Sequence, residues 1–181
     1  VAGIAWLCVY AVAAARMVAR ISDRSGFGFA DFFSALKPSV RPGLALAAFV
    51  LVIVYLASAA VPFYLASKTL PGLLAAATVF WSAMLALLAA QFFPAAVARG
   101  DGSLVGAIRQ CSMVFFDNTI FSIMVAVLSL PLAALSILLA FVLPGPTGIL
   151  LMYDEAYRLR CMKYPWLQSH PGARRRHIPW Q

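Results

Sequence analysis

Residues able to do acid–base or nucleophilic chemistry are few in this sequence and poorly arranged for it. The two histidines, His170 and His177, both lie near its end. Asp154 and Glu155 are adjacent, so on a helix of about 3.6 residues per turn their carboxylates diverge, a poor geometry for a general acid and base. We expect both to pair with Arg158 instead, at the i+4 and i+3 spacings. The pattern predicts a protein that is not an enzyme and has no catalytic residues.

The cysteines give no metal or cofactor site either. Cys8, Cys111 and Cys161 are far apart and fit no metal-ligand spacing, so we interpret them as free thiols. Carriers driven by protons or sodium normally keep charged groups deep in the membrane, and the long apolar runs of this chain contain none. We therefore expect no metal, no cofactor and no ion-coupled pump.

The composition points to a membrane protein. The chain has 181 residues, of which 64% are hydrophobic and 11% charged, whereas soluble domains are about half apolar and about a quarter charged. The apolar residues form long continuous runs rather than alternating, which predicts helices. The net charge of +8 comes from loops and the tail. It is better explained by cytoplasmic loops and anionic headgroups than by nucleic acid.

The apolar runs predict an all-α, polytopic transmembrane bundle of about five spans. Four are long and one is a short segment that follows Pro144-Gly145-Pro146. The first run begins at residue 1 and is short, so we expect it to be truncated at its N-terminal end. Residues 1–164 would form the transmembrane domain and residues 165–181 a basic cytoplasmic tail. The long runs lie at residues 1–15, 43–67, 72–98 and 118–143.

Two amphipathic cytoplasmic helices are expected between these spans. In residues 21–42, Phe29, Phe32, Phe33 and Leu36 fall on one helical face, and Pro38 is expected to end that helix. The face would lie among the lipid headgroups or pack on the protein's own spans, and the sequence does not decide between them.

The second amphipathic helix is expected within residues 99–117. Asp101 or Ser103 would cap it. Its apolar stripe consists of Leu104, Ile108, Cys111 and Phe115.

The basic residues predict the orientation and a return crossing. All Lys and Arg residues except Lys68 fall on the cytoplasmic side if the two amphipathic loops and the tail are inside. Residues 144–160 must then cross back, with a sheltered helix break at Pro144–Gly148 near the outer leaflet. Alternatively, Pro131 is the tip of the hairpin and the Pro-Gly-Pro sequence kinks the returning helix.

Three groups of residues are candidate sites. The helix break could form a pocket, and Gln91, Asn118 and Thr119 could line a polar path. The run Arg174, Arg175 and Arg176 would contact anionic lipid, or else dock a cytosolic partner. The pocket residues are Pro144, Gly145, Pro146, Thr147 and Gly148.

Three stretches resemble the YesL-like family of bacterial membrane proteins, whose function is uncharacterised. They are VAGIAWLCVYAVAAAR at the start, SGFGFADFFSALKPSVRPGLALA, and LPGPTGILLMYDEAYRLRCMKY. The resemblance implies a further helix before residue 1, about five spans, the plasma membrane and an association with carbohydrate uptake. The tail KYPWLQSHPGARRRHIPW departs from the short ends of that family. No catalytic residues are implied.

These observations predict a multi-pass protein of the bacterial plasma (inner) membrane with its C-terminal tail in the cytoplasm. It would be a non-enzymatic accessory or scaffold subunit associated with transport, in contact with anionic headgroups and a membrane-protein partner such as a transporter. The alternative is a small uncoupled transporter or channel. We expect no nucleic-acid partner.

Overall fold

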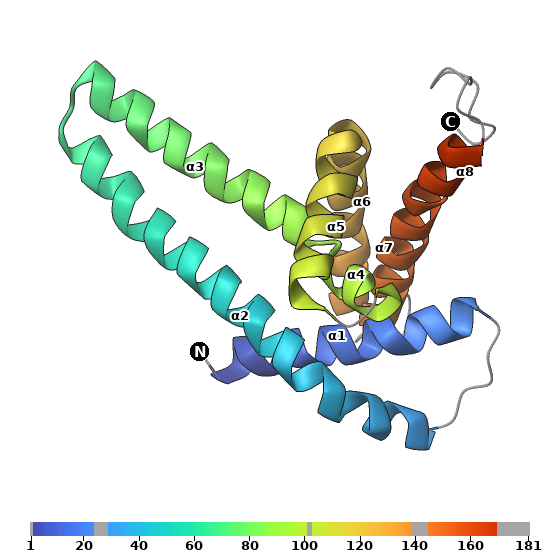
Figure 1. Ribbon diagram of the computed structural model, residues 1–181. Helices are drawn as coiled ribbons and strands as arrows, with labels where there is room; N and C mark the ends of the chain where they lie inside the picture. Colours follow the sequence, from blue (N-terminus) through green and yellow to red (C-terminus); the bar gives the residue numbers. More distant parts are fainter. Residues whose placement is uncertain (1, 24–28, 101–102, 139–144, 170–181) are drawn as a thin grey trace.

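The computed structural model describes residues 2–23, 29–100, 103–138 and 145–169. Within these ranges the chain is entirely helical, as the sequence predicts, and contains no strand (Figure 1). The helices are α1 (Ala2–Ser22), α2 (Phe29–Ala66), α3 (Leu70–Ala90), α4 (Phe93–Arg99), α5 (Leu104–Asp117), α6 (Thr119–Leu138), α7 (Gly145–Cys161) and α8 (Lys163–Ser169).

Within the described residues, four stretches are long and apolar enough to cross a membrane, which supports the prediction of a membrane protein. The helix α7 is not among them: it has only 17 residues, and its second half carries Asp154, Glu155, Arg158 and Arg160. The four stretches are Ala2–Ser22, Asp31–Ala66, Leu70–Arg99 and Thr119–Ser136.

Helix α2 is longer than the sequence predicts. Pro38 was expected to end an amphipathic helix, but α2 continues through Pro38 and Pro42 for 38 residues. A proline removes only one hydrogen bond of the helix, and in apolar surroundings the other backbone groups have no better partners. The hydroxyl of Ser39 also donates to the carbonyl of Ala35 at 2.7 Å. The first amphipathic segment and the second span are therefore one helix.

Small residues let α2 pack closely on α1. Ala35, Ser39, Gly43 and Ala47 recur every four residues on one face of α2, and all are buried. A Cβ atom built on Gly43 would lie 2.5 Å from the Cα of Val9 in α1. Such spacing of small residues is a common device for close helix contact in membranes.

The third predicted span is broken near its end. Residues 72–98 were expected to form one helix, but α3 ends at Ala90 and α4 begins at Phe93. Pro94 causes the break because it has no N–H to donate to the carbonyl of Ala90, four residues earlier. The break turns α4 into the interior, where Ala96 is fully buried.

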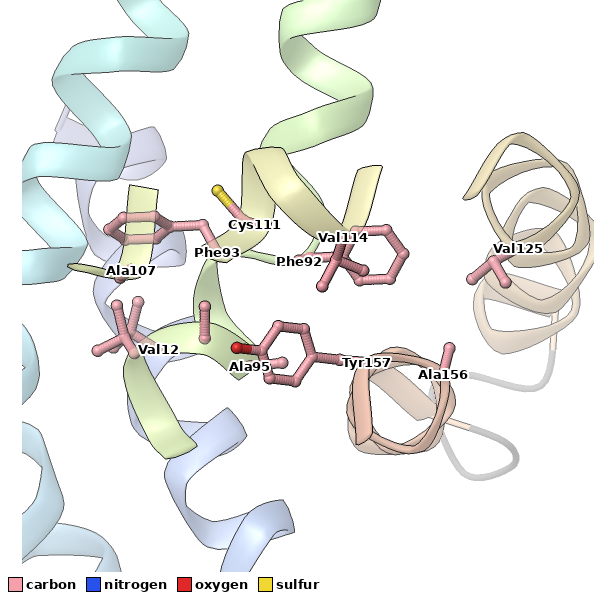
Figure 2. Packing of buried hydrophobic residues seen from close by; sticks show 12 residues of the cluster. Val12, Phe92, Phe93, Ala95, Ala107, Cys111, Val114, Val125, Ala156 and Tyr157 are labelled. Atoms are coloured by element: carbon pink, nitrogen blue, oxygen red, sulfur yellow. The ribbon is translucent and has the colours of Figure 1, made fainter. Parts of the chain in front are cut away.

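The core is built around α4 (Figure 2). Phe92, just before α4, and Phe115 of α5 are both fully buried. Helix α1 packs against α2, α4 and α7, so it is buried on several faces. Side chains from α1, α4, α5, α6 and α7 meet in this core, including Val12, Ala95, Ala107, Val114, Val125 and Tyr157.

Helices α6 and α7 run antiparallel. The hydroxyl of Tyr153 donates to Ser129 at 2.9 Å, and the guanidinium of Arg160 lies 3.9 Å from the ring centre of Phe121. Thus positions later in α7 meet positions earlier in α6. Helix α6 passes through Pro131 and ends at Leu138, so the alternative that placed the hairpin tip at Pro131 is wrong.

On the predicted amphipathic faces of α2 and α5, some residues pack inside the protein and others are exposed. In α2, Phe32 makes an edge contact with Tyr10 of α1, with ring centres 6.0 Å apart, whereas Phe33 is 72% exposed. Helix α5 forms as predicted and is capped by Ser103. On its predicted stripe Cys111 and Phe115 are buried but Ile108 is exposed, since α5 rotates Ala107 and Val114 into the core. A position of either helix at the membrane surface stays a prediction.

Helices α2 and α3 form a hairpin that extends away from the rest of the molecule (Figure 1). The tight turn at Lys68 is confirmed. Lys68 adopts a left-handed conformation with φ of 50°, and the side chain of Thr69 accepts from the backbone N–H of Gly72 at 3.3 Å. Almost no residue in the apolar windows of either helix is buried.

Candidate functional site

The most strongly organised polar site centres on Asp154 of α7. This carboxylate is completely buried and receives two hydrogen bonds from Arg99, at the end of α4. The Nε atom of Arg99 lies 2.8 Å from Oδ1, and Nη2 lies 2.7 Å from Oδ2. This two-pronged arrangement matches the planar guanidinium to the carboxylate, and it compensates for removing the charges from water.

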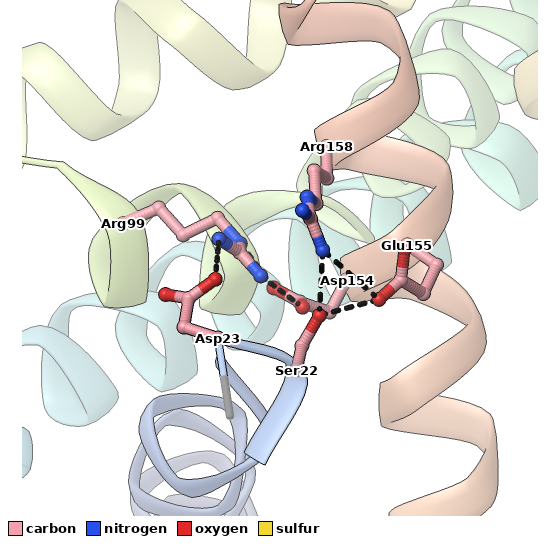
Figure 3. A network of polar contacts seen from close by, with 6 residues as sticks. All are labelled: Ser22, Asp23, Arg99, Asp154, Glu155 and Arg158. Atoms are coloured by element: carbon pink, nitrogen blue, oxygen red, sulfur yellow. Dashed lines mark hydrogen bonds and ion pairs between the residues drawn. The ribbon is translucent and has the colours of Figure 1, made fainter. Parts of the chain in front are cut away.

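A second layer of contacts ties α1 to the same pair (Figure 3). Arg99 also donates to Asp23, just after α1, at 3.3 Å. Ser22 donates to Glu155 and accepts from Arg158 at 3.1 Å. We call these six residues the polar network: Ser22, Asp23, Arg99, Asp154, Glu155 and Arg158.

The sequence predicted this network only in part. The nitrogen of Arg158 lies 3.7 Å from Glu155, as expected for neighbours on one helix. Asp154 does not pair with Arg158 but with Arg99, which is distant in sequence. One feature of the sequence could have indicated the Arg99–Asp154 pair: Arg99 ends an apolar run, and Pro94 bends that run inward. Asp23 and Ser22 carried no such signal.

The network is suited to holding helices together rather than to catalysis. Both oxygens of Asp154 accept from Arg99, so neither is directed at a cavity as a base would be. Within the described ranges no group of three His, Cys, Asp or Glu residues could hold a metal ion. The prediction that the protein is not an enzyme stays a prediction.

The three cysteines are free thiols, as predicted. Cys111 is buried in the core, where its thiol donates to the carbonyl of Ile108 at 3.1 Å. Burial raises the pKa of the Cys111 thiol, because the thiolate would lose its hydration. Nearby, the hydroxyl of Tyr157 donates to Gln110 at 2.8 Å.

The side chains that were predicted to line a polar path form hydrogen bonds with backbone carbonyl groups instead. The amide of Gln91 donates to the carbonyl of Ser122 at 3.0 Å, which joins the end of α3 to the start of α6. Asn118 donates to the carbonyl of Val114 at 3.5 Å, and Thr119 to that of Phe115 at 3.1 Å. All three are near one another in the fold, but their polar atoms serve helix ends and helix contacts.

The other predicted sites lie wholly or partly outside the described residues. Pro144 and the run Arg174, Arg175 and Arg176 fall outside them. Gly145, Pro146, Thr147 and Gly148 form the first turn of α7, and Thr147 is exposed there. Four of the five predicted pocket residues thus belong to α7, and both the break and a pocket there stay predictions.

Of the cavities that border the packed centre, two differ sharply in the character of their walls. One, of about 480 Å³, lies among α2, α3 and α5, and its walls are almost wholly apolar, with Leu46, Leu85 and Ile108 among them. The other, of about 470 Å³, lies between α1 and the end of α4 and is lined by charged residues. We call the second one the basic cleft; it is lined by Arg16, Ala19, Arg20, Asp23, Val97, Ala98, Arg99 and Gly100.

Comparisons of the chain with protein-family models, curated proteins and solved structures find no match. The function is therefore argued from the geometry of the chain itself.

Proposed function

We propose that this chain is a multi-pass protein of a bacterial plasma membrane that acts as a non-enzymatic accessory or scaffold subunit of a transport assembly. In this proposal the polar network holds the cytoplasmic ends of the helices together. The α2–α3 hairpin contacts a helix of a partner membrane protein. The link to carbohydrate transport rests on the resemblance to YesL-like proteins.

The observation that carries the proposal is a pair of amphipathic aromatic residues on the hairpin. Tyr55 lies 11 residues before the end of α2 and Trp81 lies 11 residues after the start of α3. At 1.5 Å per residue both are about 16 Å from the turn, which is about half of a hydrocarbon core of about 30 Å. In a hairpin that crosses the bilayer they lie near its middle.

This depth is unusual for such residues when they face lipid. Tyr55 is 73% exposed and Trp81 is 60% exposed. Within the described part of the chain neither the hydroxyl of Tyr55 nor the indole N–H of Trp81 has a hydrogen-bond partner. Tyrosine and tryptophan facing lipid normally sit at the membrane surface, where their polar atoms reach water. A partner helix offering acceptors at this depth would satisfy both groups.

The polar network supports a scaffold role in a different way. Arg99, Asp154 and Asp23 hold the end of α4, the middle of α7 and the end of α1 together, whereas the apolar windows of the hairpin helices are almost wholly unburied. A rigid base with an extended apolar hairpin is suited to presenting a surface to another protein. The alternative of a small uncoupled transporter or channel rested on the predicted break before the short last segment and on Gln91, Asn118 and Thr119. The bonds of these three side chains to backbone carbonyls weaken the second ground.

A photo-crosslinking experiment in the native membrane tests the proposal. A photoreactive amino acid at position 55 should give one discrete adduct with another membrane protein. The matched control is position 56, because Leu56 is 58% exposed but points about 100° away around α2. We expect the control to give lipid adducts and a much weaker protein band.

A purification experiment separates partner binding from folding. Mild-detergent extraction should recover a stoichiometric partner with the wild-type chain. Tyr55→Phe combined with Trp81→Phe should lose that partner while keeping the thermal unfolding temperature, since neither polar group bonds inside the described chain. A solitary monomer from the wild type, with lipid adducts alone at position 55, would refute the proposed role.

A further inference from the structure

We propose that the basic cleft between α1 and α4 binds a phosphate group, with Arg16 and Arg20 as its main ligands. This inference is independent of the partner proposed for the hairpin. It concerns a site whose lining includes Asp23 and Arg99 of the polar network.

The first reason is an unsatisfied atom on Arg16. Its Nε atom is buried and has no hydrogen-bond partner in the structure as described. No ion pair is formed by its guanidinium there either, although it lines a cavity of about 470 Å³. A buried N–H without a hydrogen-bond partner is costly, so an anion that accepts from this guanidinium would be favoured in the cleft.

The second reason is the arrangement of like charges. Arg16 and Arg20 stand four residues apart on α1, and both line the cleft. Like charges at this spacing repel each other and destabilise the helix. Arg20 also forms an ion pair with Asp31 at 3.9 Å, between two side chains that are about half exposed.

The acids near the cleft are already occupied. Asp154 takes two hydrogen bonds from Arg99, and Asp23 lies 3.3 Å from the same guanidinium. Both acids contact Arg99, and within the described residues neither forms an ion pair with Arg16. Of the three arginines that line the cleft, Arg16 is the one that makes no ion pair with a described residue.

A phosphate is the anion that fits this pair. Its oxygens can accept from two guanidinium groups at once, and arginine binds phosphate through two parallel hydrogen bonds. Arg16 lies six residues before the end of α1, about 9 Å along the helix axis. In the proposed topology this is the depth of the cytoplasmic headgroups, where a lipid phosphate and a soluble phosphate can both enter.

Binding to the purified full chain in a neutral detergent tests the proposal. The probes are inorganic phosphate and a short-chain phosphatidylglycerol, each titrated while the unfolding temperature is followed. At least one should raise that temperature saturably. Saturation by phosphatidylglycerol alone assigns the site to a lipid headgroup, and saturation by inorganic phosphate assigns it to free phosphate.

Variants identify the ligands. Arg16→Gln should weaken binding of the effective probe about tenfold or more, the loss of one charge-assisted pair. Arg41→Gln removes the same charge from an exposed position on α2 and should bind like the wild type. Without ligand, Arg16→Gln should unfold at the same or a higher temperature, because it removes an unpaired charge. Arg20→Gln should also weaken binding.

The opposite results overturn the proposal. It fails if neither probe gives a saturable shift. It also fails if Arg16→Gln binds as tightly as the wild type, or if Arg41→Gln loses as much affinity as Arg16→Gln. Whether the hairpin variants lose or keep a partner protein does not affect these binding measurements. Either proposal can therefore be refuted without refuting the other.

Discussion

At the scale of single residues, Asp154 shows how a charge can be kept inside an apolar protein. Its side chain is fully buried, while that of its partner Arg99 is 18% exposed. A buried ion pair of this kind does not contribute much net stability compared with a well-packed apolar pair, but breaking it leaves one charge without compensation. Its role here is to fix which helices meet.

We therefore predict that Asp154→Ala destabilises the protein strongly. Removing one partner of a buried pair typically costs about 3–5 kcal/mol, and here the remaining guanidinium would keep only its longer contact with the exposed Asp23. The measurement is the free energy of unfolding in detergent, followed by helix content. Arg99→Leu combined with Asp154→Leu should recover part of the loss, since neither charge then remains.

Glu155→Gln is the matched control for this prediction. Glu155 is adjacent to Asp154, but its side chain is 50% exposed and its pair with Arg158 is 3.7 Å long. Exposed pairs contribute at most about 1 kcal/mol. A cost for Asp154→Ala no greater than that for Glu155→Gln would contradict the central place of the Arg99–Asp154 pair.

At the scale of helices, the sequence predicted the apolar segments well and the effect of prolines poorly. Pro38 and Pro42 do not end α2, whereas Pro94, which had been placed inside a span, breaks it. A proline removes one hydrogen bond wherever it stands. Whether the helix continues past the proline depends on packing. Helix α2 packs along α1, whereas the break at Pro94 lets α4 pack into the core.

The candidate site was less predictable for a related reason. Pairing along one helix follows from spacing, and the Glu155–Arg158 pair was found that way. The partner of Asp154 depends on how α4 and α7 pack, which no local pattern records. Likewise, Arg16 and Arg20 looked like a flank of the first span, and only the packing of α1 on α4 shows that they share a cleft.

The close contact of α1 and α2 gives a prediction at this scale. Gly43→Ala should destabilise the protein by about 1–3 kcal/mol, because the new methyl group would meet the backbone of Val9 and force the helices apart. Gly3→Ala is the control: nothing lies within 4 Å of its Cβ position, and alanine favours a helix by about 0.5–1 kcal/mol. Unfolding in detergent measures both, and equal effects would contradict the close packing.

At the scale of the whole molecule, the helix ends that the basic residues assign to the cytoplasmic side of the membrane are in contact with one another. Arg99 joins the end of α1 to α7, and Asp117 at the end of α5 contacts Lys163 at the start of α8 at 3.7 Å. Gln91 joins the end of α3 to the start of α6. The turn at Lys68 lies at the far end of the hairpin, away from all of these (Figure 1). The fold and the charge distribution therefore agree on which ends belong together.

Cysteine labelling in intact cells tests the direction of this arrangement. In a background without Cys8, Cys111 and Cys161, Arg174→Cys should react with an impermeant thiol reagent only after the cells are opened. Leu70→Cys, next to the turn and 71% exposed, should react in intact cells. These results are expected because the positive-inside rule keeps the basic tail in the cytoplasm and leaves only Lys68 outside. The reverse pattern would invert the topology. It would also place Arg16 and Arg20 at the outer surface, where any phosphate bound in the basic cleft would have to come from outside the cell.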